Sequence, residues 1–288
     1  MTAPTPLDTF TRTAYKAANE VIDGYSTSFG TATALLGARH RQHIRNVYAL
    51  VRVADEIVDG VAQEAGLSLS EQRGALERFR AETDRAVACG YSADVIVHAF
   101  ACTAKDSGIG TDLTDPFFDS MAMDLEPRAA TEHDAYVYGS AQVVGLMCLR
   151  VFIRDEEPDA RRLEILENGA RQLGAALQDI NFLRDLRADT DMGRNYLGDG
   201  RHLDEAAKSE WVARVRVQLA DAEASVPYLP RDARAAVRCA HAVFSRLVDR
   251  IDETPVATLY SSRVRVPNAV KAWLAAKSVI TTMTERTR

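Results

Sequence analysis

The segment Gln178–Asp189 constrains the fold of this chain most, because it combines an apolar helix with a line of polar side chains. No glycine or proline interrupts the segment, so we predict a helix there. The other faces are largely apolar, and a helix that is apolar nearly all round belongs in a protein interior. At about 100° per residue, four polar side chains fall within an arc of roughly 80°. They are Gln178, Asn181, Asp185 and Asp189. The polar stripe is therefore expected to face an internal cavity.

Two carboxylates four residues apart on such a stripe repel each other and are costly to bury. A bound cation would remove that cost, so Asp185 and Asp189 indicate a metal site. Hard divalent ions take oxygen ligands, and Mg²⁺ usually combines one or two carboxylates with substrate phosphates. We therefore expect Mg²⁺, with Mn²⁺ as a second option, beside a phosphorylated substrate.

A second segment repeats the arrangement, with arginines preceding an aspartate pair. Five polar side chains again share an arc of roughly 80°. They are Arg45, Tyr48, Arg52, Asp55 and Asp59. Two Asp-x-x-x-Asp stripes on facing helices can clamp a metal cluster, and arginines can hold a polyphosphate beside it.

The rest of the chain reads as helices joined by short turns, with no convincing strand pattern. We predict an all-α single domain over residues 1–288, disordered up to about Asp8. The acidic stripes would lie on helices from about Arg39 to Asp59 and from about Ala160 to Ala188. The polar, glycine-rich segment Asp189–Gly200 would form a loop that closes over the site.

Composition excludes several classes of protein. A net charge of −6 argues against a general nucleic-acid binder. The four cysteines form no Cys-x-x-Cys pair, which fits a reducing compartment and gives no zinc-site spacing. The start lacks the pattern of a signal peptide, and no apolar run of about 18 residues predicts a transmembrane segment. We expect a cytoplasmic protein, and peripheral association with a membrane surface stays open.

At these residues the chain resembles the phytoene/squalene synthase family, the head-to-head prenyl synthases. The resemblance extends from about Tyr15 to Lys277, and the runs 53–60 and 138–141 are most similar to bacterial phytoene synthases. The motifs that carry it are Ser26-Thr27-Ser28-Phe29, Tyr48-x-x-x-Arg52-x-x-Asp55-x-x-x-Asp59, Tyr136…Gly145, Gln178-x-x-Asn181-x-x-Arg184-Asp185-x-x-x-Asp189, Gly193-Arg194-x-Tyr196 and Arg263-x-Arg265-x-Pro267.

The resemblance implies the isoprenoid synthase fold, a helical bundle around a deep apolar pocket. The implied Mg²⁺ ligands are Asp55, Asp59, Asn181, Asp185 and Asp189. The four aspartates, Arg52 and Tyr48 would be catalytic. The implied substrate contacts are Ser26, Ser28, Phe29, Arg45, Tyr48, Arg52, Tyr136, Gln178, Asn181, Arg184 and Arg265.

Several of these side chains also have structural interpretations. Ser26 and its neighbours form a hydroxyl-rich turn whose local sequence favours a helix cap. Arg52 could be an ion-pair partner of Asp55 or Asp59, and Arg184 could pair with another acid. Tyr136 suits a core as well as a pocket.

The implied reaction is the Mg²⁺-dependent condensation of two geranylgeranyl diphosphates to phytoene, without NADPH. A squalene or dehydrosqualene synthase that uses farnesyl diphosphate is the main alternative. A chain-elongating prenyltransferase normally has Asp-Asp-x-x-Asp motifs, to which Asp55-Glu56-x-x-Asp59 is a near miss. A non-catalytic assembly protein with this fold would have lost its metal ligands, and this chain keeps all four aspartates.

Three positions depart from the family's pattern. Ala188 stands where members often have glutamate, Gln142 where many have a small residue, and Phe244 where relatives often have tyrosine. Ala188 puts only an outer acid in doubt, because Asp185 and Asp189 remain. Phe244 removes a hydroxyl contact, so no role is transferred to it.

Overall fold

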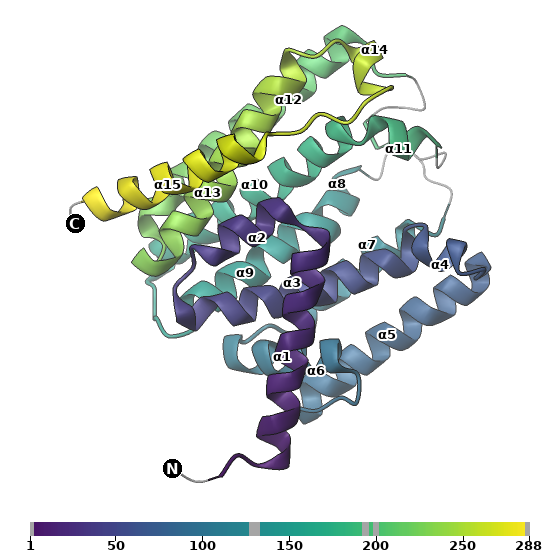
Figure 1. The fold of residues 1–288 in the computed structure, drawn as a ribbon, viewed down its shortest axis with the longest axis vertical. Coiled ribbons are helices and arrows are strands. Elements are labelled where there is room, and N and C mark those ends of the chain that lie inside the picture. The colour runs from purple at the N-terminus through teal and green to yellow at the C-terminus, as the bar shows by residue number, and fades with distance from the viewer. Residues whose placement is uncertain (1–2, 127–132, 192–195, 198–201, 286–288) are drawn as a thin grey trace.

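The computed structural model describes residues 3–126, 133–191, 196–197 and 202–285, apart from the side chains at positions 188, 189 and 191. Its regular elements are helices, and no strand occurs within these ranges, so the all-α prediction is confirmed (Figure 1). The long helices are α1 (Pro6–Tyr25), α3 (Ala38–Val58), α5 (Leu69–Cys89), α10 (Ala160–Arg184), α12 (Glu205–Ser225), α13 (Arg231–Asp252) and α15 (Asn268–Thr284).

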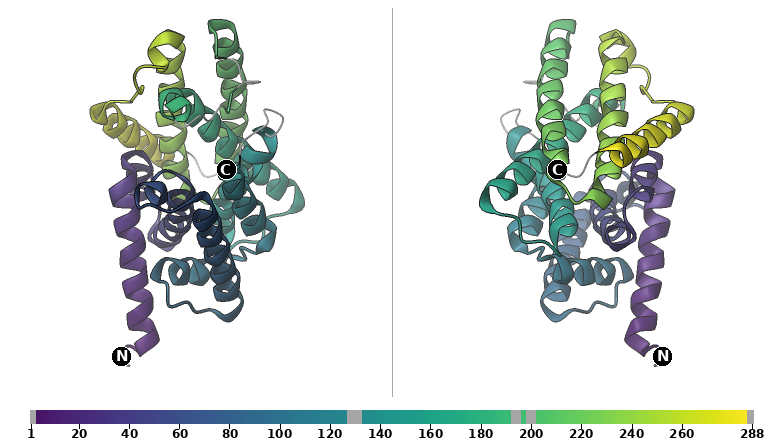
Figure 2. Two further views of the ribbon diagram at one scale, coloured as in Figure 1. Left: turned by 90° about the vertical axis from the view of Figure 1, so that its right-hand side faces the viewer. Right: turned by 90° about the vertical axis from the view of Figure 1, so that its left-hand side faces the viewer.

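Shorter helices connect the long ones. They are α2 (Thr27–Ala34), α4 (Val61–Glu64), α6 (Val95–Ser107), α7 (Thr111–Met123), α8 (His133–Val137), α9 (Val143–Ile153), α11 (Leu186–Asp191) and α14 (Val256–Leu259). A π-helical turn, η2 (Tyr138–Gln142), joins α8 to α9, and a 3₁₀ turn, η3 (Val226–Tyr228), follows α12. The two ends of the chain lie apart, with α1 along one side of the bundle and α15 on the outside (Figure 2).

The N-terminal segment is more ordered than predicted. Helix α1 begins at Pro6, so the prediction of disorder up to about Asp8 is wrong for this part of the segment. The Thr5 hydroxyl accepts a hydrogen bond from the Asp8 amide (3.1 Å), and the Asp8 carboxylate accepts one from the Thr5 amide (2.8 Å). This reciprocal capping box, with proline in the first helical position, stabilises the start of the helix.

Glycines let α10 pack closely against the helix formed by α8, η2 and α9. A Cβ atom on Gly174 would lie 2.4 Å from the Ala141 carbonyl oxygen, and one on Gly145 would lie 2.3 Å from that of Ala170. The span His133–Ile153 is long and apolar enough to cross a membrane, but 61% of its most apolar window is buried inside the protein. It is therefore a core helix of the bundle.

Both acidic stripes lie where a helix ends; the end near Asp59 agrees with the predicted bounds, whereas the break at Asp185 was not predicted. Helix α3 ends at Val58, and Asp59 caps it with an extended backbone. Helix α10 ends at Arg184, so the predicted continuous helix to Ala188 is wrong. Asp185 is the C-cap, with a ψ of 13°, and α11 begins at the next residue. Aspartate has low helix propensity, but neither glycine nor proline marks this break, so periodicity alone could not reveal it.

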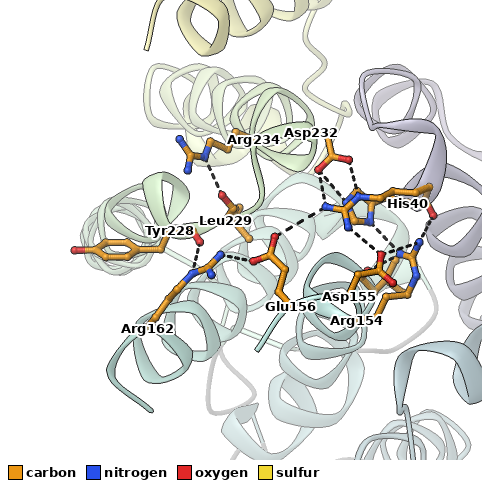
Figure 3. A network of polar contacts seen from close by, with 11 residues as sticks. His40, Arg154, Asp155, Glu156, Arg162, Tyr228, Leu229, Asp232 and Arg234 are labelled. Atoms are coloured by element: carbon orange, nitrogen blue, oxygen red, sulfur yellow. Dashed lines mark hydrogen bonds and ion pairs between the residues drawn. The ribbon is translucent and has the colours of Figure 1, made fainter. Parts of the chain in front are cut away.

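An ionic network ties together the start of α3, the end of α9 and the start of α13 (Figure 3). Arg39 donates to Asp232 (2.8 Å) and Asp155 (2.9 Å). The buried His40 ring lies between Asp232 (3.2 Å) and the guanidinium of Arg154 (3.1 Å). The Arg39 hydrogen bond lowers the pKa of Asp232 to about 2, whereas burial lowers the pKa of His40. We call these five residues the base network.

Candidate active site

A cavity of about 790 Å³ lies between α2, α3, η2–α9, α10 and α13. Its lining is largely apolar and includes Phe117, Met121, Leu149, Phe152 and Leu166. Polar residues reach it from α2, from α3, from the end of α10 and from the segment 263–271. The cavity therefore combines an apolar interior with a polar rim.

Helix α3 contributes Tyr48, Arg52 and Asp55 to the lining. The face of α3 that lines the cavity centres between Tyr48 and Val51, and Arg45 lies about 90° away from that centre. Arg45 is accordingly absent from the described lining, as is Asp59 beyond the end of the helix. The structure thus brings three of the five predicted α3 residues together at the cavity.

Arg52 is held by several neighbours at once. Its guanidinium donates to Asp55 and Glu56, and it lies over the Tyr25 ring, 4.5 Å from the ring centre. The ion pair with Asp55 is the structural alternative that the sequence left open. Because both partners line the cavity, the pair is also part of its polar rim.

Ser26 both caps a helix and lines the cavity. Its Oγ accepts a hydrogen bond from the Phe29 amide (3.1 Å), so the predicted helix cap is confirmed as the N-cap of α2. Ser26, Ser28 and Phe29 also line the cavity. Burial raises the pKa of Tyr48, while Arg52 and a hydrogen bond with Ser26 act in the opposite direction.

The end of α10 supplies Gln178, Asn181 and Arg184 to the lining. The Asn181 Oδ1 atom is buried and has no hydrogen-bond partner within the described part of the chain. Asp185 lies just outside the lining, where Arg184 (3.0 Å) and Arg263 (2.7 Å) both donate to its carboxylate. The side chain of Asp189 and the residues Gly193 and Arg194 lie outside the described residues, as does most of the predicted closing loop.

Besides Arg52, four further cations lie at the rim, and two of them had no predicted role. Arg184, Arg263, Arg265 and Lys271 all line the cavity. Burial lowers the pKa of Arg263 and of Lys271, and the positive charges of Arg184 and Arg265 lower both further. Lys271 also donates to the Thr27 hydroxyl (2.9 Å). Asp185 pairs with only two of these cations, Arg184 and Arg263. A set of partly buried like charges is costly unless further negative charge balances it, so the rim is suited to a phosphate-bearing ligand.

Tyr136 lines the cavity and is also part of the core, so both interpretations of it hold. Its hydroxyl donates to Asp124 (2.9 Å), which accepts a second hydrogen bond from Tyr196 (3.0 Å). Phe182 stacks on Tyr196 with ring centres 4.2 Å apart. Asp124 thus holds Tyr196, the first described residue after α11, in place. No sequence motif pointed to Asp124, because its partners are 12 and 72 residues away along the chain.

The three departures lie in different surroundings. Phe244 lines the cavity, with its ring centre 5.8 Å from that of Phe29. Gln142 belongs to η2 but is not among the described lining residues. The side chain of Ala188 is outside the described part.

The donor atoms at the rim suit a hard cation. Asp55 and Asn181 both present side-chain oxygens to the cavity, and Asn181 Oδ1 has no hydrogen-bond partner among the described residues. Among the described residues no three acidic, histidine or cysteine side chains converge as a ready metal site. Both carboxylates near the rim already have cationic partners, since Arg52 pairs with Asp55, and Arg184 and Arg263 pair with Asp185.

These features define a helical protein with a large, mostly apolar cavity, whose rim brings together Asp55, several arginines and a lysine. The sequence profile of the squalene/phytoene synthase family matches residues 22–205. The chain therefore belongs to this family of prenyltransferases, the head-to-head prenyl synthases, as its motifs indicated.

Among curated relatives, phytoene synthase 3 of Zea mays is 27% identical over 300 residues, which cover 96% of this chain and 68% of the maize protein. The 15-cis-phytoene synthase of Synechocystis is 29% identical and covers 92% of this chain, which spans 86% of that relative. The chain spans only 61% of a phytoene synthase from an Oncidium hybrid, at 28% identity.

Solved structures establish the fold. A dehydrosqualene synthase superposes with a TM-score of 0.79 at 19% identity, covering 96% of this chain and 98% of that one. A squalene synthase from Alicyclobacillus acidocaldarius gives a TM-score of 0.70 at 16% identity, covering 88% and 98%. The predicted isoprenoid synthase fold is confirmed.

Proposed function

We propose that this enzyme condenses two geranylgeranyl diphosphates head to head and releases phytoene. The observation that carries the proposal is the large cavity, apolar inside and cationic at its rim, within a chain of this family. Its volume of about 790 Å³ is toward the upper end of the roughly 300–1,000 Å³ typical of small-molecule sites, which suits long hydrocarbon chains. The similarity to phytoene synthases supports the choice of a forty-carbon product.

The residues at the rim would drive the first step. Breaking the allylic C–O bond leaves diphosphate and a carbocation. Arg184, Arg263 and Lys271 would stabilise the departing negative charge. Phe29 and Phe244 present aromatic rings to the cavity, and ring faces attract cations. The apolar lining would keep water from quenching the carbocation.

The second half of the reaction would use the same cavity. The cation adds to the double bond of the second substrate, and loss of a proton gives a cyclopropylcarbinyl diphosphate. A second ionisation releases the other diphosphate, and rearrangement followed by loss of one more proton gives the linear polyene. Released diphosphate at the cationic rim can accept the proton, so no reductant is needed.

We further propose that the enzyme depends on Mg²⁺. Asp55, Asn181 and Asp185 would hold the ion together with Asp59 and Asp189. When bound, the ion supplies positive charge that neutralises the diphosphates. The unsatisfied oxygen of Asn181 supports this assignment, because a buried acceptor without a partner is costly.

A thirty-carbon product from farnesyl diphosphate is the second candidate. We retain this candidate because the fold is similar to that of a dehydrosqualene synthase, with a TM-score of 0.79. Squalene would additionally require hydride delivery to the last cation, hence NADPH.

Product analysis separates these candidates. The enzyme is incubated with geranylgeranyl or farnesyl diphosphate and Mg²⁺, with and without NADPH, and the hydrocarbon is identified. We expect phytoene from geranylgeranyl diphosphate without NADPH. Much higher efficiency with farnesyl diphosphate, or a strict need for NADPH, would overturn the choice of product. Absence of diphosphate release with every substrate would indicate a non-catalytic protein.

A further inference from the structure

Helix α15 exposes an apolar face that no other described part of the chain covers. Three large side chains dominate it: Trp273 (60% exposed), Ile280 (62%) and Met283 (72%). At about 100° per residue they lie with three alanines in an arc of roughly 100°. The α15 apolar face comprises Ala269, Ala272, Trp273, Ala276, Ile280 and Met283. Within the described residues, no other helix exposes three large hydrophobic side chains.

The opposite side of α15 is firmly attached to the bundle. Leu274 and Ala275 pack with Ala32 of α2 and with Cys239 and Val243 of α13. Helix α15 lies along α13 on the outside of the molecule (Figures 1 and 2). Its apolar face therefore points away from the core, and contiguous exposed apolar surface on a well-packed helix marks an interaction site.

The charge around this face is positive, although the whole chain is acidic. The described residues 263–285 contain four basic side chains and one acid, a net charge of +3 in a chain of net charge −6. The acid, Glu285, is paired with Arg234 and Arg238 of α13. The neighbouring helix α2 contains no ionisable residue. The four basic residues are Arg263, Arg265, Lys271 and Lys277.

The same helix begins at the rim of the cavity. Asn268 and Lys271, in the first turn of α15, both line it. Lys277 lies over the Trp273 ring, 5.3 Å from its centre, so a cation accompanies the largest apolar side chain. The apolar face and the cavity rim therefore share one helix, and cations lie along it.

We propose that the α15 apolar face docks this protein on an anionic phospholipid bilayer. Helices with aromatic and aliphatic residues on one face and lysine or arginine beside them lie in the bilayer interface in this manner. A second copy of the chain fits less well, because a two-fold contact through this face would bring the positive charges of both copies together. Docking would also place the cavity rim near the lipid surface; the delivery of a prenyl diphosphate by this route rests on the proposed function.

Vesicle co-sedimentation tests the docking without any substrate. The full chain is mixed with phosphatidylcholine vesicles that contain or lack phosphatidylglycerol. We expect binding to the anionic vesicles and little to the neutral ones. Trp273→Ser, Ile280→Ser and Met283→Ser combined should weaken binding at least tenfold. Val217→Ser on α12, where the side chain is 63% exposed, is the matched control and should bind like the wild type.

Charge gives a second measurement. Lys277→Gln should weaken binding to anionic vesicles about fivefold, the effect of one basic residue near a charged membrane surface. Raising the salt concentration should weaken wild-type binding, because the surface charges are screened. Circular dichroism verifies that each variant keeps its helices.

Three results would overturn the proposal. They are equal binding by the triple variant and the wild type, equal binding to neutral and anionic vesicles, and a wild-type dimer that the triple variant abolishes while vesicles remain unbound. The last result would assign the face to a second copy of the chain. Hydrocarbon production in detergent tests the proposed function separately, so a failure of docking and a failure of catalysis are distinguishable.

Discussion

Arginine meets carboxylate in two regions of this protein, with different consequences. In the base network, Arg39, Arg154, Asp155 and Asp232 surround His40, and none of these residues lines the cavity. At the cavity rim, Arg52 pairs with Asp55 and Glu56, and two arginines share Asp185. The same residue types therefore hold helix ends together in the base network and form part of a candidate ligand site at the rim.

The difference lies in how completely each set satisfies its own charges and hydrogen bonds. Both ring nitrogens of His40 have partners, and the Asp232 carboxylate accepts from Arg39 twice. At the rim, buried Arg52 Nε and Asn181 Oδ1 have no hydrogen-bond partner within the described residues, and like charges converge. A polar set that is complete stabilises a fold, whereas an incomplete one that lines a cavity indicates a ligand.

The largest expected effect is the loss of catalysis without loss of fold at the rim. Asp55→Ala and Asp185→Ala should each lower turnover roughly a thousandfold, because the electrostatic stabilisation of the departing diphosphate is removed. Removing divalent ions with a chelator should have the same effect on the wild type. Turnover with prenyl diphosphate and far-ultraviolet circular dichroism are the measurements. Near-normal turnover in both variants would contradict the assignment of these aspartates as metal ligands.

A smaller effect is expected from Arg52→Lys. A guanidinium can grip diphosphate oxygens with two parallel hydrogen bonds, whereas an ammonium acts as a point charge, so turnover should fall about 10- to 100-fold. The melting temperature should change little. Arg39→Lys in the base network is the matched control and should leave turnover intact. A large loss of stability with intact catalysis would make Arg52 a purely structural ion-pair partner.

The base network should show the reverse pattern. Asp232→Ala leaves Arg39 and the buried His40 without their shared acceptor, which should lower the free energy of unfolding by about 2 kcal/mol. Denaturant unfolding measures that loss, and turnover at a temperature where the variant is folded should remain near that of the wild type. Lost turnover in a folded variant would show that the base network also shapes the cavity.

The smallest expected effect is a pH dependence of stability. Burial lowers the pKa of His40 in the folded state, so the unfolded chain binds more protons below pH 6.5, the ordinary histidine value. The free energy of unfolding should be highest above about pH 6.5 and should decrease as the pH falls toward 5. His43 and His98 have lowered pKa values for the same reason and contribute in the same direction. His40→Gln should therefore reduce this slope but not abolish it, as unfolding at several pH values can measure. An unchanged slope would show that His40 does not contribute to the pH dependence of stability.

The sequence by itself determined the helical class, the face of α3 that carries Tyr48, Arg52 and Asp55, and the cap at Ser26. These are local properties, since the helical period fixes which side chains share a face and a serine before a helix satisfies a free amide. The order and spacing of the motifs also identified the family, which the profile match to residues 22–205 supports independently.

Only the tertiary structure decided which residues meet. The close approach at Gly174, the break at Asp185 and the convergence of Arg263 and Lys271 on the end of α10 depend on contacts between distant segments. The same is true of the displacement of Arg45 from the cavity, because packing chooses which part of an amphipathic arc faces inward. Periodicity places side chains around a helix axis, but the neighbouring helices set the rotation and the end of each helix.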